Sequence, residues 1–159
     1  MSLLDKEPVK RVEKFLKDFD QSLEVIVLEN SARTAQDAAE ALDCNVGAII
    51  KSLLFRTGDD FTLCLVAGDK RCSLNKLKEI TGKKDVSMAS PEDVKTQTGY
   101  TIGGVSPIGH LRKIEIIIDN SLERFNELFA AAGHPNCVFK INLNNIQKIT
   151  NGKVKDIVE

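Results

Sequence analysis

Two apolar segments separated by a short polar turn place the tightest limit on how this chain folds. The first covers residues 49–56, the second covers residues 61–67, and Thr57-Gly58-Asp59-Asp60 lies between them. Apolar runs of this length around a Gly/Asp turn are typical of two β-strands joined as a hairpin. We therefore expect an antiparallel hairpin over these residues.

Helical and strand patterns are intermixed along the rest of the chain. Thr34 followed by Asp37 resembles a capping box, and Ser90-Pro91 has the pattern of an N-cap followed by a first-turn proline. The predicted helices cover 8–19, 35–42, 73–81, a segment beginning at Ser90, 121–132 and 142–150; the further predicted strands cover 24–28, 114–118 and 138–141. The mixture, with at least one hairpin, predicts one mixed-sheet α/β domain over residues 1–159.

The charge balance excludes several classes of protein. The 159 residues contain 22 Lys and Arg against 23 Asp and Glu, a net charge of −1. Such a chain does not coat DNA tightly and non-specifically, so we expect no DNA partner. No apolar run approaches the ~20 residues of a membrane span, and residues 1–10 are charged where a signal peptide needs an apolar core. We expect a cytoplasmic protein with no membrane contact.

The cysteines and histidines do not have metal-ligand spacing. They are scattered, with no Cys-x-x-Cys pair and no Cys/His cluster: Cys44, Cys64, Cys72, Cys137, His110 and His134. A zinc site is not expected from such spacing, and a chain of this size needs no disulfide framework. We predict no metal and no cofactor.

Lys51 is an ionic residue inside an apolar strand. Because strand side chains alternate, Lys51 shares its face with Ile49, Leu53 and Phe55. Either the strand lies at a sheet edge and the amine reaches water, or the amine lies at the mouth of an apolar cleft. A partly buried amine needs an anionic partner, and no acidic residue lies in this strand. A phosphate or a developing oxyanion of a ligand would meet that need.

A glycine-rich segment follows at residues 98–109. Glycines permit positive φ and a close approach of backbone N–H groups to a ligand, although a long turn between a helix and a strand explains the composition equally well. The segment lacks the Gly-Lys-Ser/Thr ending of a P-loop. It is also no nucleophile elbow, because Pro107 has no N–H to donate after Ser106. We do not expect Ser106 to be a covalent nucleophile.

Three segments together carry a specific resemblance. Residues 50–55, residues 65–69 and the segment from Thr98-Gly99-Tyr100 to Gly109 resemble the YbaK family in order and spacing. That family is related to the editing domain of bacterial prolyl-tRNA synthetases. The resemblance extends from about residue 34 to residue 156, and it implies a twisted mixed sheet, partly barrel-like, flanked by helices.

The resemblance implies a free-standing aminoacyl-tRNA deacylase. Such enzymes hydrolyse the ester of a mischarged tRNA, usually tRNA(Pro) carrying a small wrong amino acid such as Cys, Ala or Ser. Lys51 matches the family's required lysine, which would hold the 3′-terminal nucleotide. The backbone from Gly103 through Gly104, Val105 and Ser106 to Pro107 matches the loop that cradles the aminoacyl carbonyl. A ribose hydroxyl, a water or the substrate's own side chain would attack the ester, with no protein nucleophile or metal.

The chain departs from family members that act on Cys-tRNA(Pro) at the expected amino-acid pocket. Leu28 stands in place of a tyrosine, Ser52 in place of a threonine and Val138 in place of an aspartate. Some alanine-editing relatives use a pocket histidine, for which His134 is a candidate, although a histidine in the turn before Pro135 is as good an interpretation. We expect Ser52, Leu28 and His134 to contact the substrate.

Basic residues concentrate between Asp69 and Lys84, with further cations after the glycine segment. They predict either a solvated helix face or a surface for the tRNA acceptor end, with Lys70, Arg71 and Arg112 as the candidate contacts. Tyr100 either stacks on the terminal adenine or packs in the protein with its hydroxyl at the surface.

Two other functions remain open from the sequence. The chain could be a non-catalytic module that binds tRNA ends or nucleotides and assists a synthetase, with transient contact to prolyl-tRNA synthetase. It could also be a purely structural interaction domain, in which case Lys51 would lie on an exposed edge with no cleft beside the glycine loop.

Overall fold

Short helices and strands alternate along the chain in the computed structural model, which describes residues 2–30 and 32–159. The α-helices are α1 (Glu7–Phe19), α2 (Ala35–Leu42), α3 (Leu74–Thr81), α4 (Pro91–Thr98) and α5 (Leu143–Thr150), and the 3-10 helices are η1 (Leu3–Asp5), η2 (Val46–Ala48) and η3 (Asn120–Arg124). The strands are β1 (Val25–Val27), β2 (Ile50–Thr57), β3 (Asp60–Ala67), β4 (Val86–Met88), β5 (Glu115–Asp119), β6 (Leu128–His134), β7 (Cys137–Ile141) and β8 (Lys153–Lys155).

The predicted hairpin is confirmed. Strands β2 and β3 pair antiparallel along their whole length, from Ile50 opposite Ala67 to Thr57 opposite Asp60. Gly58 in the turn has a φ of 68°, a conformation that glycine adopts without steric cost. The hairpin forms the middle of a five-stranded sheet in the order β4-β2-β3-β5-β8.

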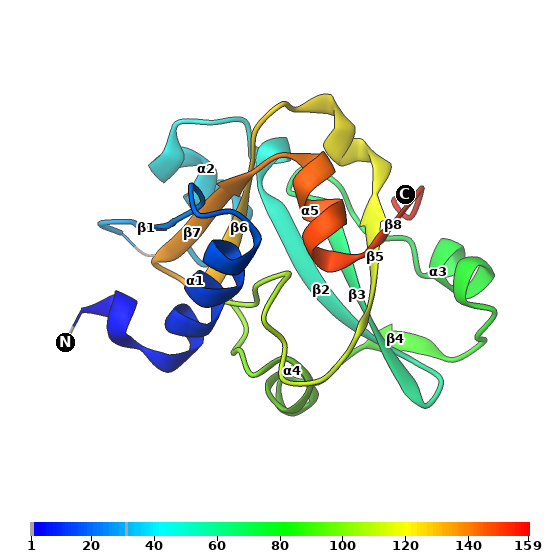
Figure 1. The fold of residues 1–159 in the computed structure, drawn as a ribbon. Coiled ribbons are helices and arrows are strands. Elements are labelled where there is room, and N and C mark those ends of the chain that lie inside the picture. Colours follow the sequence, from blue (N-terminus) through cyan, green and yellow to red (C-terminus); the bar gives the residue numbers. More distant parts are fainter. Residues whose placement is uncertain (1, 31) are drawn as a thin grey trace.

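The five-stranded sheet is mixed, as the predicted fold class requires. In the five-stranded sheet, β4 pairs antiparallel with β2, whereas β5 and β8 extend the sheet in parallel. A separate three-stranded antiparallel sheet has the order β1-β7-β6 and lies beside α1 (Figure 1). In the part of the chain that the structure describes, the two sheets meet at one backbone bridge, between Ile49 and Phe129, and do not close into a barrel.

Both faces of the five-stranded sheet are covered, and the alternation of β2 follows from this. Ile50 and Leu54 belong to the larger core, to which α1 and α5 contribute. Phe55 belongs to a second core on the opposite face, where Leu77 of α3 packs. Successive strand residues point to opposite faces, so a sheet buried on both faces gives the continuous apolar run seen in the sequence.

The helix boundaries follow local capping signals. The side chains of Thr34, Ser73, Ser90 and Asn142 each accept a hydrogen bond from a backbone N–H in the first turn of α2, α3, α4 and α5. These contacts satisfy donors that would otherwise lack a partner. Of the capping box expected at Thr34, the N-cap is confirmed, with Asp37 N–H donating to Thr34 Oγ1 over 3.1 Å. The return bond from Thr34 N–H to the Asp37 carboxylate is absent among the described residues.

The helix predicted over 121–132 is wrong. The chain forms the short η3 there and then enters strand β6. Leu122 is fully buried and Asp119 accepts the Ser121 N–H over 2.9 Å, which holds the short 3-10 turn in place. The alanines of β6 favour a helix by propensity, but α1 packs closely on this strand. Small side chains therefore serve close packing here.

Two short strands were not predicted. Strands β4 and β8 each contain three residues and lie at the edges of the five-stranded sheet. Three residues are too few to show a period in the sequence, so pairing with a neighbour defines them. Among the described residues, no helix is both long and apolar enough to cross a membrane.

Candidate functional site

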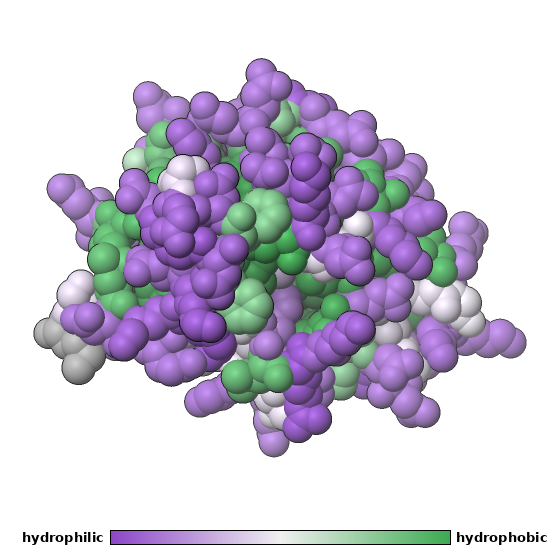
Figure 2. Space-filling view, in the orientation of Figure 1, coloured by the Kyte–Doolittle hydropathy of each residue, from purple (hydrophilic) through white to green (hydrophobic). Residues whose placement is uncertain are grey.

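A cavity of about 400 Å³ lies between β2, the three-stranded sheet and the glycine-rich loop. Its walls are mostly apolar, and Figure 2 shows apolar surface gathered around a hollow in the middle of the face, framed by polar residues. The residues that line it include Arg33, Lys51, Ser52, Gly103, Val105, His134 and Val138. Concave apolar cavities with a few polar groups are the usual sites of small ligands.

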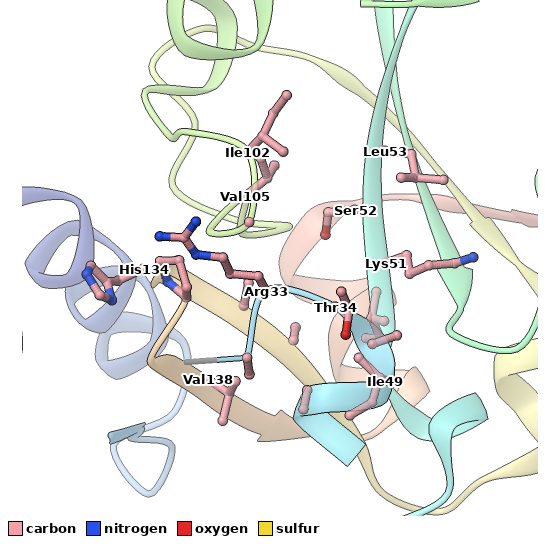
Figure 3. Close-up of a pocket in the computed structure, with 18 of the residues that line it drawn as sticks. Arg33, Thr34, Ile49, Lys51, Ser52, Leu53, Ile102, Val105, His134 and Val138 are labelled. Carbon is pink, nitrogen blue, oxygen red and sulfur yellow. The ribbon is translucent and has the colours of Figure 1, made fainter. Parts of the chain in front are cut away.

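Lys51 lies in the wall of this cavity, but its amine turns away from the centre. The Lys51 ammonium donates a hydrogen bond to the backbone carbonyl of Lys70. Figure 3 shows that its side chain leaves β2 on the side opposite Ser52. Burial lowers the pKa of Lys51, and the nearby Asp69 carboxylate opposes that shift. The amine thus faces the start of the segment rich in basic residues, between Asp69 and Lys84.

Ser52 provides a polar group in the apolar wall. Its Oγ is buried and has no hydrogen-bond partner among the described residues. In Figure 3 the hydroxyl lies on the cavity side of β2. A buried hydroxyl without a partner carries a desolvation penalty, which a ligand group can relieve. The predicted substrate contact at Ser52 is therefore placed where a ligand could reach it.

The glycine-rich loop forms the opposite wall, and only part of it reaches the cavity. Gly103 and Val105 line the cavity, whereas Gly104, Ser106 and Pro107 are buried behind it. Gly103 has a φ of 96°, which strongly favours glycine. Ser106 is fully buried, and its Oγ accepts the N–H of Ile108 over 3.4 Å. The structure thus brings two of these five predicted residues to the wall.

Tyr100 and His110 hold this loop in shape. Tyr100 is buried, and its hydroxyl donates to the carbonyls of Ile108 at 2.7 Å and Gly109 at 3.1 Å. Burial raises the pKa of Tyr100 to about 12. His110 Nε2 donates to the Ser106 carbonyl over 2.7 Å, and burial lowers the pKa of His110. Tyr100 is therefore a packing residue, with its hydroxyl inside the protein.

The three-stranded sheet supplies the third wall. His134 and Val138 line the cavity, and His134 Nδ1 accepts the Asn136 N–H over 3.0 Å. Burial, with Lys6 and Arg33 nearby, lowers the pKa of His134, which favours its neutral form. Leu28 does not line the cavity; it is buried, and its N–H donates to the Asn136 carbonyl over 2.7 Å.

Arg33 is a wall residue that no sequence pattern predicted. It is exposed, it lines the cavity, and in Figure 3 its side chain extends toward Val105 of the loop. Its only signal in the sequence is its position directly before the capping residue Thr34. No ion pair involving Arg33 occurs among the described residues. Its cation is available to an anionic ligand at the mouth.

The predicted tRNA contacts lie outside the cavity. Arg71 is exposed and Lys70 is partly exposed, beside the carbonyl that receives the Lys51 amine. Arg112 is exposed, and its N–H donates to Gln97 at the end of α4. Lys70 and Arg71 therefore adjoin Lys51, whereas Arg112 belongs to the α4 side. Within residues 2–30 and 32–159, no group of three or more His, Cys, Asp or Glu residues could hold a metal ion.

Comparisons with known proteins agree with one another. Residues 29–149 match the family model described as the aminoacyl-tRNA editing domain. The chain is 33% identical over 147 residues to the uncharacterized protein YwhH of Bacillus subtilis, covering 92% of this chain and 93% of YwhH. It is 30% identical over 125 residues to a proline–tRNA ligase of Thermosipho africanus, covering 79% of this chain and 22% of that enzyme.

A solved structure supports the same relationship. It is described as a candidate trans-editing enzyme for prolyl-tRNA synthetase and superimposes with a TM-score of 0.91 at 34% identity. The match covers 97% of this chain and 98% of that protein. With the family model matching residues 29–149 and the fold agreeing throughout, this chain belongs to the aminoacyl-tRNA editing domain family.

Proposed function

We propose that this editing enzyme hydrolyses the aminoacyl ester of tRNA(Pro) charged with a small wrong amino acid, namely Cys, Ala or Ser, and that it acts in trans on tRNA already released by the synthetase. The observation that carries this proposal is the apolar cavity between β2 and the loop at Gly103. It offers room for an aminoacyl group, and in this proposal the part that receives the side chain rejects larger side chains by its size.

The chemistry requires little beyond positioning. An aminoacyl ester is already activated, so oriented donors and a fixed geometry suffice for a useful rate. The attacking oxygen or sulfur comes from a ribose hydroxyl, a water or the substrate's side chain. No side chain of the wall is required as a nucleophile, which is consistent with the burial of Ser106.

The tRNA end approaches, in this proposal, from the side of Lys51. The Lys51 amine lies beside Lys70 and Arg71, where a phosphate of the 3′-terminal nucleotides would meet several cations. Phosphate contacts of this kind position a nucleic acid without reading its sequence. Arg112 belongs to the α4 side and is proposed as a more distant contact. Contact with prolyl-tRNA synthetase would be transient, and the enzyme would work in the cytoplasm as one domain over residues 1–159.

A deacylation panel tests the proposal. Purified protein is incubated with tRNA(Pro) charged with Cys, Ala, Ser, Thr or Pro, and with correctly charged tRNA(Ala) and tRNA(Cys). We expect faster release from at least one of the Cys, Ala and Ser esters of tRNA(Pro) than from the Pro ester. Saturable tRNA binding with no hydrolysis of any ester would support the non-catalytic binding module instead.

A further inference from the structure

Strand β2 has one edge that is only partly paired. Along one edge it pairs with β3 throughout. Along the other edge, β4 pairs only with Phe55–Thr57, and Ala89 N–H donates to the Leu54 carbonyl over 3.0 Å. Strand β6 lies near β2, but among the described residues its backbone bridge to this segment is at Ile49. Among the described residues, the segment from Lys51 to Leu53 therefore has no strand paired with it by hydrogen bonds on that edge.

The backbone groups of Ser52 point to this open edge. In an antiparallel strand, the N–H and C=O of one residue point to one edge and those of the next residue to the other. The Leu54 carbonyl reaches Ala89 on the β4 side, so the backbone groups of Ser52, two residues earlier, point the same way. Lys51 and Leu53 bond with β3 instead.

The cavity lies directly against this edge. Every residue from Ile49 to Leu54 lines it, including residues whose side chains leave opposite faces of the sheet. Consecutive strand residues can line one cavity only when that cavity meets the strand edge. Among the described residues, the N–H and C=O of Ser52 have no backbone hydrogen-bond partner, and they face the same space as the buried Ser52 hydroxyl, which also has none.

None of the described residues that line the cavity carries a carboxylate. The α-amino group of an aminoacyl ester must therefore find a neutral acceptor in the described wall, and a backbone carbonyl is such an acceptor. The ester carbonyl oxygen in turn needs a donor, which a backbone N–H provides. An aminoacyl group carries its nitrogen and its carbonyl on a single residue, with the spacing found across a hydrogen-bonded antiparallel pair.

We propose that the main chain of Ser52 binds the aminoacyl group as if it were a one-residue strand added to β2. The Ser52 carbonyl accepts from the α-amino group, and the Ser52 N–H donates to the ester carbonyl oxygen. That oxygen gains negative charge when the attacking atom adds to the ester carbon. The hydrogen bond from the Ser52 N–H to this oxygen therefore strengthens in the transition state. The substrate side chain lies on the face of Ser52 Oγ. This inference rests on the proposed function.

A proline substitution isolates the N–H. Ser52→Pro removes a donor that makes no bond to β3, and proline is tolerated at edge positions whose N–H faces away from the ladder. Ser52→Ala removes only the hydroxyl and is the matched control. We expect a kcat for Ser52→Pro about 100-fold below that of Ser52→Ala, with circular dichroism and cooperative melting retained. Equal kcat values in two folded variants would overturn the proposal.

An ester in place of the backbone amide at position 52 covers the case in which proline disrupts the strand. This replacement, introduced with an α-hydroxy acid, deletes the N–H and keeps the geometry. We expect a loss of kcat similar to that of Ser52→Pro, whereas full activity in this variant contradicts the inference.

Amide exchange tests the edge without turnover. In the free protein, we expect the Ser52 N–H to exchange faster than those of Lys51 and Leu53. Adding 3′-alanylamido-3′-deoxyadenosine, in which an amide replaces the ester, should shift and protect the Ser52 amide. A Ser52 amide that is protected without the analogue, or unshifted at saturation, or an analogue that does not bind, overturns the inference. Analogue binding at Ser52 without hydrolysis in the deacylation panel rejects only the proposed function.

Discussion

The two long walls of the cavity use their polar groups in different ways. In the loop wall, the Tyr100 hydroxyl and His110 Nε2 are bonded to carbonyls of the loop itself. In the strand wall, Ser52 Oγ has no partner in the described structure and the β2 edge is open beside it. The loop therefore fixes the shape of the cavity, and the strand offers the groups that a substrate can engage. Substitutions in the strand wall should reduce turnover, and those in the loop wall should reduce stability.

Lys51→Ala should have the largest effect on turnover. We expect deacylation to fall by at least about 100-fold. The substitution removes the only ammonium on strand β2 and leaves empty space in the outer part of the cavity wall. Rates of ester hydrolysis and thermal melting together measure this. Lys70→Ala is the comparison variant: it removes a neighbouring proposed phosphate contact but keeps the backbone carbonyl that receives the Lys51 amine, so it should reduce turnover less than Lys51→Ala.

Undiminished hydrolysis by Lys51→Ala would refute the assignment of Lys51 as the central cation. A loss of folding alone would instead indicate that Lys51 acts by ordering the segment at Lys70.

Tyr100→Phe, in contrast to Lys51→Ala, should reduce stability more than turnover. It leaves the Ile108 carbonyl without its donor, whereas Gly109 keeps the bond from Arg11 Nε at 2.6 Å. We expect the free energy of unfolding to fall by about 1–2 kcal/mol, with turnover changed by only a few-fold. Urea denaturation and the deacylation assay give the two values. A large loss of turnover at unchanged stability would contradict the division between the walls.

Arg33→Ala should have a smaller effect, on binding. We expect the exposed guanidinium at the mouth to contact the tRNA and not the reacting atoms, so KM should rise roughly 3- to 10-fold at unchanged kcat. The dependence of KM on salt should weaken as well. Arg112→Ala, on the α4 side, is the comparison and should change KM less. A drop in kcat for Arg33→Ala would place this side chain in the chemistry itself.

Acid should weaken the loop wall slightly through His110. Its folded pKa lies below the ordinary value near ~6.5, so the unfolded chain takes up the proton first as the pH falls. The contribution to stability is complete above that value and is lost below it. We expect a lower melting temperature near pH ~5.5 than near pH ~7.5. His110→Gln should show a smaller difference, and an unchanged difference would exclude His110 as its source.

Local signals predicted much of the fold. The hairpin turn at Gly58 and the caps at Thr34 and Ser90 depend on neighbours within a few residues, so the sequence contains what they need. Strand β6 depends on distant segments instead. Ala130 and Ala132 are buried against other elements, and that packing overrides their helix propensity. Gly133 shows how closely β6 packs on α1, since a Cβ there would lie 2.9 Å from the backbone of Pro8.

Site residues that belong to a sequence motif could be predicted, whereas residues that reach the site only through folding could not. Lys51 and Gly103 were found from their segments, and both line the cavity. Arg33 looks like any exposed cation before a helix, so only the folded chain shows that it lies at the mouth. Ser106 belongs to the motif, but its burial depends on how the loop folds around it.

The single bridge between Ile49 and Phe129 has a consequence for how such an enzyme changes selectivity over evolution. The hollow lies in the seam between two sheets, each of which is held by its own ladder. Side chains that line the cavity, such as Val138 of β7 and Val105 of the loop, can be exchanged without removing a backbone hydrogen bond from either sheet. A few substitutions in the cavity lining can thus adapt the same fold to a new amino acid, while both sheets keep their strand pairing.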